Sequence, residues 1–196
     1  MVRVAFTGHR PDKLGFGYNV NSKKYDNLKQ AVVDALEGIT VSIGDIEEAY
    51  TGGALGFDWI AFDMLMLMRW HGWKGISTLA IPFKQQDAKW TEYDAETYRM
   101  MKIRADKVVY VDEIEGYQPR KNVIGEYSGA KMQLRNMYMV DNADILISCW
   151  DRVEKGGTWN CVKYALDKGK TVLNINPKTY EIARLEKVNN EKKEGK

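Results

Sequence analysis

Short apolar runs alternate with longer amphipathic stretches along this chain, and that alternation limits the folds that the chain can adopt. The runs cover residues 2–6, 46–51, 76–81, 107–111, 143–148 and 171–175. Several of them contain no regular polar alternation, which is typical of strands buried on both faces of a parallel sheet. The pattern predicts an α/β fold with a mostly parallel sheet of five to six strands and helices on both faces.

The stretches between the runs carry apolar residues three and four positions apart, which predicts helices. We expect helices over residues 22–39, 57–72, 86–106, 126–142 and 157–169, and a long loop over 112–125. Residues 64–68 form a methionine-rich stripe, which we interpret as core, with a homodimer interface as the alternative. We expect a single domain over residues 1–180, followed by a charged helix or tail over 181–196.

The composition excludes several classes of protein. Lysine and arginine number 29 and aspartate and glutamate 27, so a net charge of +2 argues against a dedicated nucleic-acid binder. No apolar run approaches the roughly 20 residues of a membrane span, and a strand starting at residue 2 leaves no room for a targeting segment. We therefore expect a soluble, cytoplasmic protein. Cys149 and Cys161 lack the spacing of a metal site, so we expect two ordinary buried thiols and neither metal nor cofactor.

Polar and glycine-rich segments follow several of the expected strands, at the sheet edge where α/β proteins bind ligands. After the first strand come Thr7, Gly8, His9 and Arg10. The glycine allows a ligand to approach the backbone, and the arginine can hold a phosphate or carboxylate with two hydrogen bonds. The alternative is a tight turn with a surface arginine.

Two glycine-rich turns lead into helices, where backbone amides favour a phosphate. Gly52 and Gly53 follow the second strand, and Asp58 either binds a ribose hydroxyl or complements the helix dipole. Gly156, Gly157 and Thr158 follow the fifth strand. Neither turn has the sequence of a P-loop or of a GxGxxG dinucleotide site.

Further candidate residues lie near these turns. Pro82, Phe83 and Gln86 follow the third strand and could cover a base, while Asp151 and Asn160 could read a ribose or base. Arg135, with Asn136 beside it, adds a cation on the helix before the fifth strand, where a solvated arginine is the alternative.

Taken in order, these motifs resemble the YpsA-like branch of the SLOG superfamily. The resemblance extends over residues 2 to about 176 and rests on residues 6–11, 51–58, 81–83 with Gln86 and Trp90, 135–141, and 150–151 with Gly156–Thr158 and Asn160. It implies a Rossmann-like fold that binds nucleotides or nucleotide-derived ligands. Relatives in this superfamily include single-stranded DNA binders of the DprA type and signal sensors of the ADP-ribose type, and many of them dimerise.

The LOG branch of the superfamily hydrolyses nucleoside monophosphates with a glutamate in its glycine-rich loop. Here the corresponding stretch runs from Lys155 to Cys161 and supplies no carboxylate. An oxocarbenium-like transition state needs a negative charge close by, so this departure argues against LOG-type hydrolysis unless Glu126, Asp141 or Asp151 substitutes.

Three hypotheses follow. The first is a noncatalytic protein that binds a nucleotide or ADP-ribose-like signal, as a sensor or by sequestering it. The second is a hydrolase of a nucleotide N-glycosidic or phosphate bond, with His9 as proton carrier. The third is a regulatory protein that acts through a protein partner, and there is also the simple alternative that the loops are only turns. The first assigns no catalytic residue and predicts a ligand site made of Thr7, Gly8, His9, Arg10, Gly52, Gly53, Asp58, Pro82, Phe83, Gln86, Arg135, Asn136, Asp151, Gly156, Gly157, Thr158 and Asn160.

Overall fold

The computed structural model describes residues 1–187 and contains every strand expected from the apolar runs. The strands are β1 (Val2–Gly8), β2 (Ile46–Thr51), β3 (Ile76–Ile81), β4 (Lys107–Tyr110), β5 (Ile145–Cys149), β6 (Thr171–Ile175) and β7 (Ile182–Leu185). The α-helices are α1 (Lys23–Ser42), α2 (Phe57–Trp70), α3 (Glu92–Arg104), α4 (Gly129–Asn142) and α5 (Gly156–Asp167). Two short 3-10 helices, η1 (Pro11–Lys13) and η2 (Val111–Glu113), follow β1 and β4.

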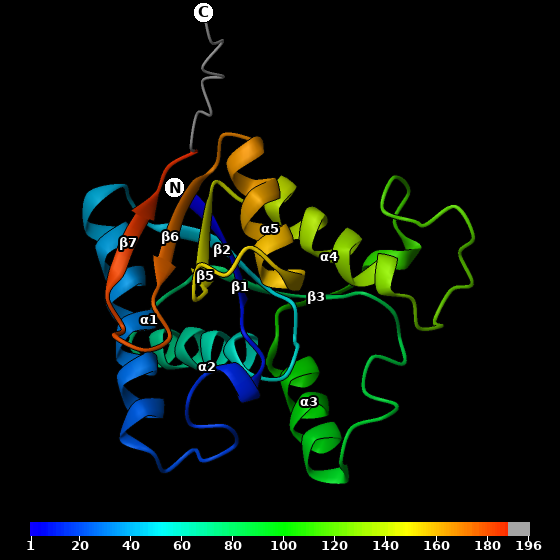
Figure 1. Cartoon of the computed structure of the whole chain (residues 1–196), viewed down its shortest axis with the longest axis horizontal. Helices are drawn as coiled ribbons and strands as arrows, with labels where there is room; N and C mark the ends of the chain where they lie inside the picture. Colours follow the sequence, from blue (N-terminus) through cyan, green and yellow to red (C-terminus); the bar gives the residue numbers. More distant parts are fainter. Residues whose placement is uncertain (188–196) are drawn as a thin grey trace, which may run out of the picture.

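All seven strands form one sheet in the order β4-β3-β2-β1-β5-β6-β7, and β1 lies at its centre (Figure 1). Strands β1 to β6 pair in parallel, which confirms the predicted α/β, Rossmann-like architecture. Successive strands proceed outward from β1 to β4, and the chain then returns to place β5 on the other side of β1. The strand order therefore reverses between β1 and β5, where folds of this kind form a crevice.

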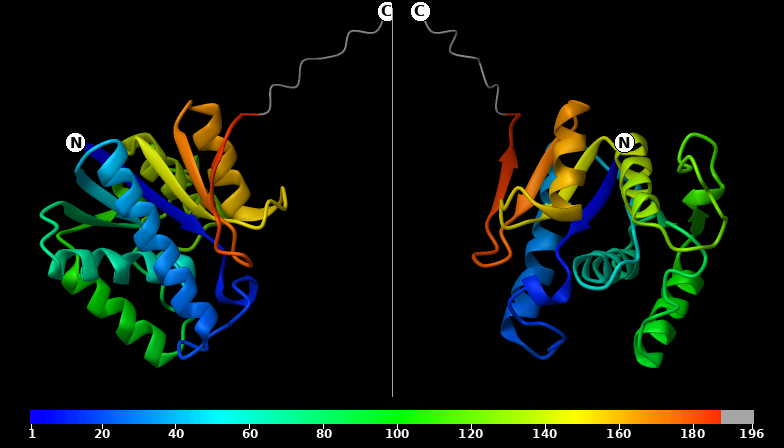
Figure 2. Two further views of the ribbon diagram at one scale, coloured as in Figure 1. Left: turned by 90° about the vertical axis from the view of Figure 1, so that its left-hand side faces the viewer. Right: turned by 45° about the vertical axis from the view of Figure 1, so that its right-hand side comes forward.

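Helices cover both faces of the sheet, as Figure 2 shows from two sides. Helices α1 and α2 pack on one face over a core that includes Val4, Phe6 and Leu65. Helices α4 and α5 cover the other face over a second cluster. Met64 and Met66 of the methionine-rich stripe are buried, in agreement with the core interpretation.

The C-terminal segment differs from the expectation of a helix. Residues 182–185 form β7, which pairs antiparallel with β6 from Ile175↔Ile182 to Val172↔Leu185. Its side chains alternate between exposed and half-buried, the pattern of an edge strand with one face on the protein. Four residues are too few for a helix to be recognised or excluded by its period, and the hydrogen-bonding edge of β6 decided the outcome. The rest of the expected helix or tail, 188–196, lies outside the described residues.

Two helices begin later than the sequence indicated. Residues 86–90 form successive turns, and α3 begins at Glu92 because the Thr91 hydroxyl accepts the Asp94 N–H (3.1 Å) and so caps the helix. Helix α4 begins at Gly129 instead of residue 126, and Ser128 occupies its N-cap position.

Two further sequence expectations concern the thiols and the membrane. Cys149 and Cys161 are both buried and unpaired with each other, and burial raises the pKa of the Cys161 thiol to about 12. Within residues 1–187, no helix combines the length and the apolar character that crossing a membrane requires.

Candidate functional site

A cleft of about 240 Å³ opens at the point where the strand order reverses. We call it the switch-point cleft. The loop after β1 forms one wall, the loop after β2 and the start of α2 form the second, and α4 with the N-terminus of α5 completes it. It is lined by Thr7, Gly8, His9, Arg10, Asp12, Lys13, Ala54, Asp58, Met132, Arg135, Asn136, Lys155, Gly156, Gly157 and Thr158.

A buried charge pair lies in the wall of this cleft. Arg135 Nη1 lies 3.6 Å from Asp58 Oδ2, and both side chains are more than nine-tenths buried. The Arg135 Nε and Nη1 atoms have no hydrogen-bond partner within the described residues. Asp58 is better satisfied, because its Oδ2 accepts the N–H of Ala54 (3.2 Å). A buried guanidinium with unused donors is costly, so this arginine is suited to an anionic ligand.

Burial shifts both members of this pair toward their neutral forms. Desolvation raises the pKa of Asp58, and the nearby Arg135 and Arg10 guanidinium groups oppose that rise. Desolvation also lowers the pKa of Arg135, against the attraction of Asp58. The negative charge of a bound phosphate would favour the charged form of Arg135 and so offset its desolvation.

The absence of a side chain at Gly52 leaves the space that the Arg135 guanidinium occupies. A Cβ atom there would overlap Arg135 Nη1 and would come within 2.6 Å of Asp58 Oδ2. The Gly52-Gly53 turn therefore shapes the floor beneath the arginine and does not itself line the cleft.

The N-terminus of α5 opens onto the cleft. Its N-cap residue, Lys155, provides no side-chain cap, and the first amides of a helix have no partner within the helix. No atom lies within 4 Å of the position that a Cβ would take at Gly157. Free amides, the helix dipole and open space together favour an anion at this point.

The charges of the lining residues agree with that preference. Arg10, Lys13, Arg135 and Lys155 contribute four cations, against the two carboxylates of Asp12 and Asp58. Arg10, Lys13 and Lys155 are exposed, so they can adjust to a ligand, whereas Arg135 is held in place.

His9 forms a second pair at the rim of the cleft. Its Nε2 accepts the backbone N–H of Asp151 (3.1 Å) and lies 3.0 Å from the Asp151 Oδ1. Desolvation lowers the pKa of His9, and the Asp151 carboxylate partly opposes this. A neutral imidazole that accepts through Nε2 carries its proton on Nδ1, so the resting His9 serves mainly to fix the backbone of the loop after β5.

The structure brings together ten of the predicted site residues: Thr7, Gly8, His9, Arg10, Asp58, Arg135, Asn136, Gly156, Gly157 and Thr158. The other seven do not line the cleft, and each has a physical reason. Gly52 and Gly53 shape the floor, and Gln86 is buried with its amide donating to the Gly53 carbonyl (3.2 Å). Pro82 and Phe83 are buried, Asp151 acts through His9, and the side chain of Asn160 is exposed on α5.

Sequence reasoning missed five lining residues: Asp12, Lys13, Ala54, Met132 and Lys155. Two of them carried a usable signal. Lys155 directly precedes the glycine pair that opens α5, and Met132 lies three positions before Arg135, on the same helix face. Lys13 enters because η1 turns the chain back after Pro11, which the residue types alone did not indicate.

Asp141 and Glu126, two of the carboxylates that the sequence offers as acid–base groups of a hydrolase, both lie outside the switch-point cleft. Asp141 accepts hydrogen bonds from the Tyr117 (2.8 Å) and Tyr164 (2.9 Å) hydroxyls and does not line the cleft. Glu126 lies in the loop before α4, also outside the lining. Residues 1–187 contain no cluster of three or more His, Cys, Asp or Glu side chains suited to a metal ion.

Comparison with known proteins agrees with this architecture. The family model YpsA, described as the YspA SLOG family, matches residues 4–185. The chain belongs to the YpsA SLOG family. It is 36% identical over 115 residues to the uncharacterized SPbeta prophage-derived protein YoqJ of Bacillus subtilis strain 168. The aligned residues make up 59% of this chain and 67% of that protein.

Two solved structures share the fold of this YpsA-family chain. DNA processing protein A (DprA) from Streptococcus pneumoniae superposes with a TM-score of 0.58 at 14% identity, over 90% of this chain and 50% of that one. The same protein from Helicobacter pylori, whose structure was described for its single-stranded DNA binding mode, gives a TM-score of 0.54 at 15% identity, over 89% of this chain and 65% of that one. The chain thus spans less than two thirds of either protein, and the likeness concerns the fold.

Proposed function

We propose that the switch-point cleft binds the phosphate of a nucleotide or nucleotide-derived, ADP-ribose-like ligand without chemical conversion, so that the protein senses or sequesters a signal. The observation that carries this proposal is the buried Arg135, whose Nε and Nη1 make no hydrogen bond within residues 1–187, beside the N-terminus of α5, which has no side-chain cap. A phosphate has enough acceptor oxygens to bind the guanidinium and the helix amides together. Membership of the SLOG family supports a ligand of this class.

The residues in the cleft favour binding over hydrolysis. Asp58 is its buried carboxylate, and Arg135 and the Ala54 N–H already engage it. A carboxylate so engaged is a poor partner for an oxocarbenium-like transition state. His9 is directed at the Asp151 backbone, so neither group is free to act as a general base on a ligand.

Single-stranded DNA is a less suitable ligand. A net charge of +2 supplies little of the phosphate neutralisation on which non-specific nucleic-acid binding depends. A cleft of about 240 Å³ also fits one phosphate-bearing group better than an extended strand.

Gly157→Asp tests the phosphate site, with Gly157→Asn as the matched control. The Cβ position at Gly157 is open, so both variants should fold, and they differ only in a carboxylate against an amide of the same shape. A ligand at about 100 times its Kd stabilises a protein by about 2.7 kcal/mol. We expect ADP-ribose to raise the melting temperature of the wild type and of Gly157→Asn. The melting temperature of Gly157→Asp should not change, because its carboxylate repels the phosphate.

Arg10→Ala should weaken the same ligand-induced shift, because Arg10 is an exposed cation at the opposite wall. Equal shifts in Gly157→Asp and Gly157→Asn would contradict a phosphate at this helix. In the same samples, ADP-ribose released by denaturation should be recovered intact, and recovery of ribose phosphate or free base would favour the hydrolase.

A further inference from the structure

A second and larger hollow, of about 540 Å³, lies on the other side of the loop after β1. Its walls come from the loop over residues 11–20, the N-terminal part of α2 and the start of α3. Five aromatic side chains line it: Phe16, Tyr18, Tyr25, Trp59 and Tyr93. We call it the aromatic hollow, and its volume lies within the usual range for small-molecule sites, about 300–1,000 Å³.

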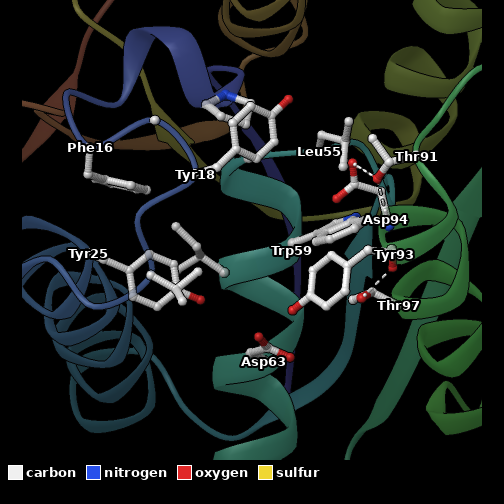
Figure 3. Close-up of a pocket in the computed structure, with 15 residues that line it drawn as sticks. Phe16, Tyr18, Tyr25, Leu55, Trp59, Asp63, Thr91, Tyr93, Asp94 and Thr97 are labelled. Atoms are coloured by element: carbon white, nitrogen blue, oxygen red, sulfur yellow. Dashed lines mark hydrogen bonds between the residues drawn. The ribbon is translucent and has the colours of Figure 1, made fainter.

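Figure 3 shows how these side chains surround the hollow. Phe16 and Tyr25 lie on the side of α1, Tyr93 lies on the side of α3, and Trp59 and Asp63 come from α2 between them. Trp59 is fixed, because its Nε1 donates to the Gly53 carbonyl (3.0 Å) and its ring meets the Trp90 ring edge-on (centroids 6.0 Å apart).

Two of the aromatic residues contribute little to the core. Tyr18 is 69% exposed and Tyr93 is 77% exposed. Large apolar rings at the mouth of a cavity are suited to stacking on a flat ligand, and their exposure gives them room to close over one.

The charge of the aromatic hollow is opposite to that of the switch-point cleft. Asp63 and Asp94 line it, and no Lys, Arg or His of the described residues does so. The Asp94 Oδ2 accepts the Thr91 hydroxyl (2.8 Å) at the start of α3, which leaves Asp63 as the carboxylate available to a ligand. A phosphate is therefore unsuitable here, and a flat ring that carries an amino donor is suitable.

The aromatic hollow and the switch-point cleft share two walls. Arg10 and Asp12 line the cleft while Pro11 lines the hollow. Ala54 and Asp58 line the cleft, while Leu55, Gly56 and Trp59 line the hollow. Consecutive Cα atoms are about 3.8 Å apart, so the wall between the two sites is only a few ångströms of main chain thick. The Phe57 N–H donates to the His9 carbonyl (3.1 Å) and holds this wall together, so a ligand that occupies both sites must pass over the wall.

We infer that the aromatic hollow binds an amino-bearing nucleobase, which belongs to the same ligand whose phosphate occupies the switch-point cleft. Tyr18, Trp59 and Tyr93 stack on the ring of the base. Asp63 accepts a hydrogen bond from its amino group. The inference rests on the proposed function and specifies its ligand as a nucleotide derivative in which base and phosphate are far enough apart to span both sites.

The test compares three probes by calorimetry on the full chain: ribose 5-phosphate, ADP-ribose and its hypoxanthine analogue, IDP-ribose. Tyr93→Ala and Tyr18→Ala should each lower the affinity for ADP-ribose by at least about fivefold, the lower limit for the loss of stacking on a base. Both variants should bind ribose 5-phosphate as the wild type does. Tyr127→Ala is the matched control, because Tyr127 is 73% exposed and lines neither site.

Asp63→Asn tests the amino group separately. The wild type should prefer ADP-ribose over IDP-ribose, and Asp63→Asn should lose that preference, because an aspartate is a better acceptor than an amide that can also donate.

The outcomes distinguish the two proposals. Wild-type affinity for ADP-ribose in Tyr18→Ala and Tyr93→Ala, with weakened binding in Gly157→Asp, would overturn the base site and leave the phosphate site standing. Failure of all three probes to bind the wild type would overturn both. A loss of affinity in Tyr127→Ala equal to that in Tyr93→Ala would also count against the aromatic hollow.

Discussion

The imidazole of His9 is buried at the end of the central strand, where it contacts the loop after β5 across 142 residues of sequence. Desolvation lowers the pKa of His9, against the attraction of the Asp151 carboxylate, and so favours the neutral imidazole. In that form Nε2 accepts the Asp151 N–H and so holds together two loops of the cleft. Protonation would require the same nitrogen to donate, and the backbone N–H would lose its partner.

His9 should therefore titrate below its ordinary pKa of about 6.5. In a His71→Gln variant the remaining imidazole signal in an NMR titration belongs to His9, because the chain has two histidines. Asp151→Asn in that background should lower the pKa further, since it removes the carboxylate that raises it. A pKa at or above 6.5 would contradict a desolvated, neutral His9.

The same shift has a consequence for stability. A folded-state pKa below the unfolded one means that the unfolded chain binds more protons in acid. The contribution of His9 is fully present above pH 6.5 and is lost as the pH falls from there toward the folded-state pKa.

A buried ion pair connects α4 to the long loop that precedes it. Lys131 Nζ contacts Asp112 Oδ2 (2.8 Å) and the Val123 carbonyl (2.6 Å), and both charged side chains are at most 2% exposed. The same Asp112 Oδ2 accepts the Gly125 N–H (2.9 Å). Because α4 also carries Arg135, the loop after β4 helps to position the arginine of the switch-point cleft.

Lys131→Ala should lower the free energy of unfolding by about 3–5 kcal/mol, because it leaves the Asp112 carboxylate buried without its charge partner. Urea unfolding measures the change. The double variant Asp112→Asn/Lys131→Met, which removes both charges, should recover part of the loss. A single variant as stable as the wild type would show that the pair does not hold the loop.

In the sheet as a whole, β7 covers the outer edge of β6 and is itself the outermost strand. It pairs antiparallel with every residue from Val172 to Ile175. An uncovered strand edge presents unpaired N–H and carbonyl groups and invites pairing with another chain.

A chain that ends at Tyr180 should therefore melt at a lower temperature and associate as its concentration rises, as measured by size-exclusion chromatography. A chain that ends at Lys187 keeps all the described residues and serves as the control. Identical elution of the two at all concentrations would show that β7 does not protect the edge of β6.

Hydrophobic periodicity was enough to predict the order of six strands and five helices along the chain, because this periodicity is a local property of each segment. The sequence also identified the glycine turns and Arg135, since phosphate sites need recognisable residue types. The start of α3 was predicted at residue 86 and lies at Glu92, because a single side-chain hydroxyl, that of Thr91, caps the helix there.

Which of those residues come together depends on how distant segments pack. The reversal of strand order beside β1 brings Arg10, Arg135 and Gly157 to one cleft and leaves Gln86 and Asn160 outside it. It also places Tyr18, Trp59 and Tyr93 around the aromatic hollow, and it pairs β7 with β6. These contacts join segments that are distant in the sequence. The strand order determines them, and local periodicity does not encode the strand order.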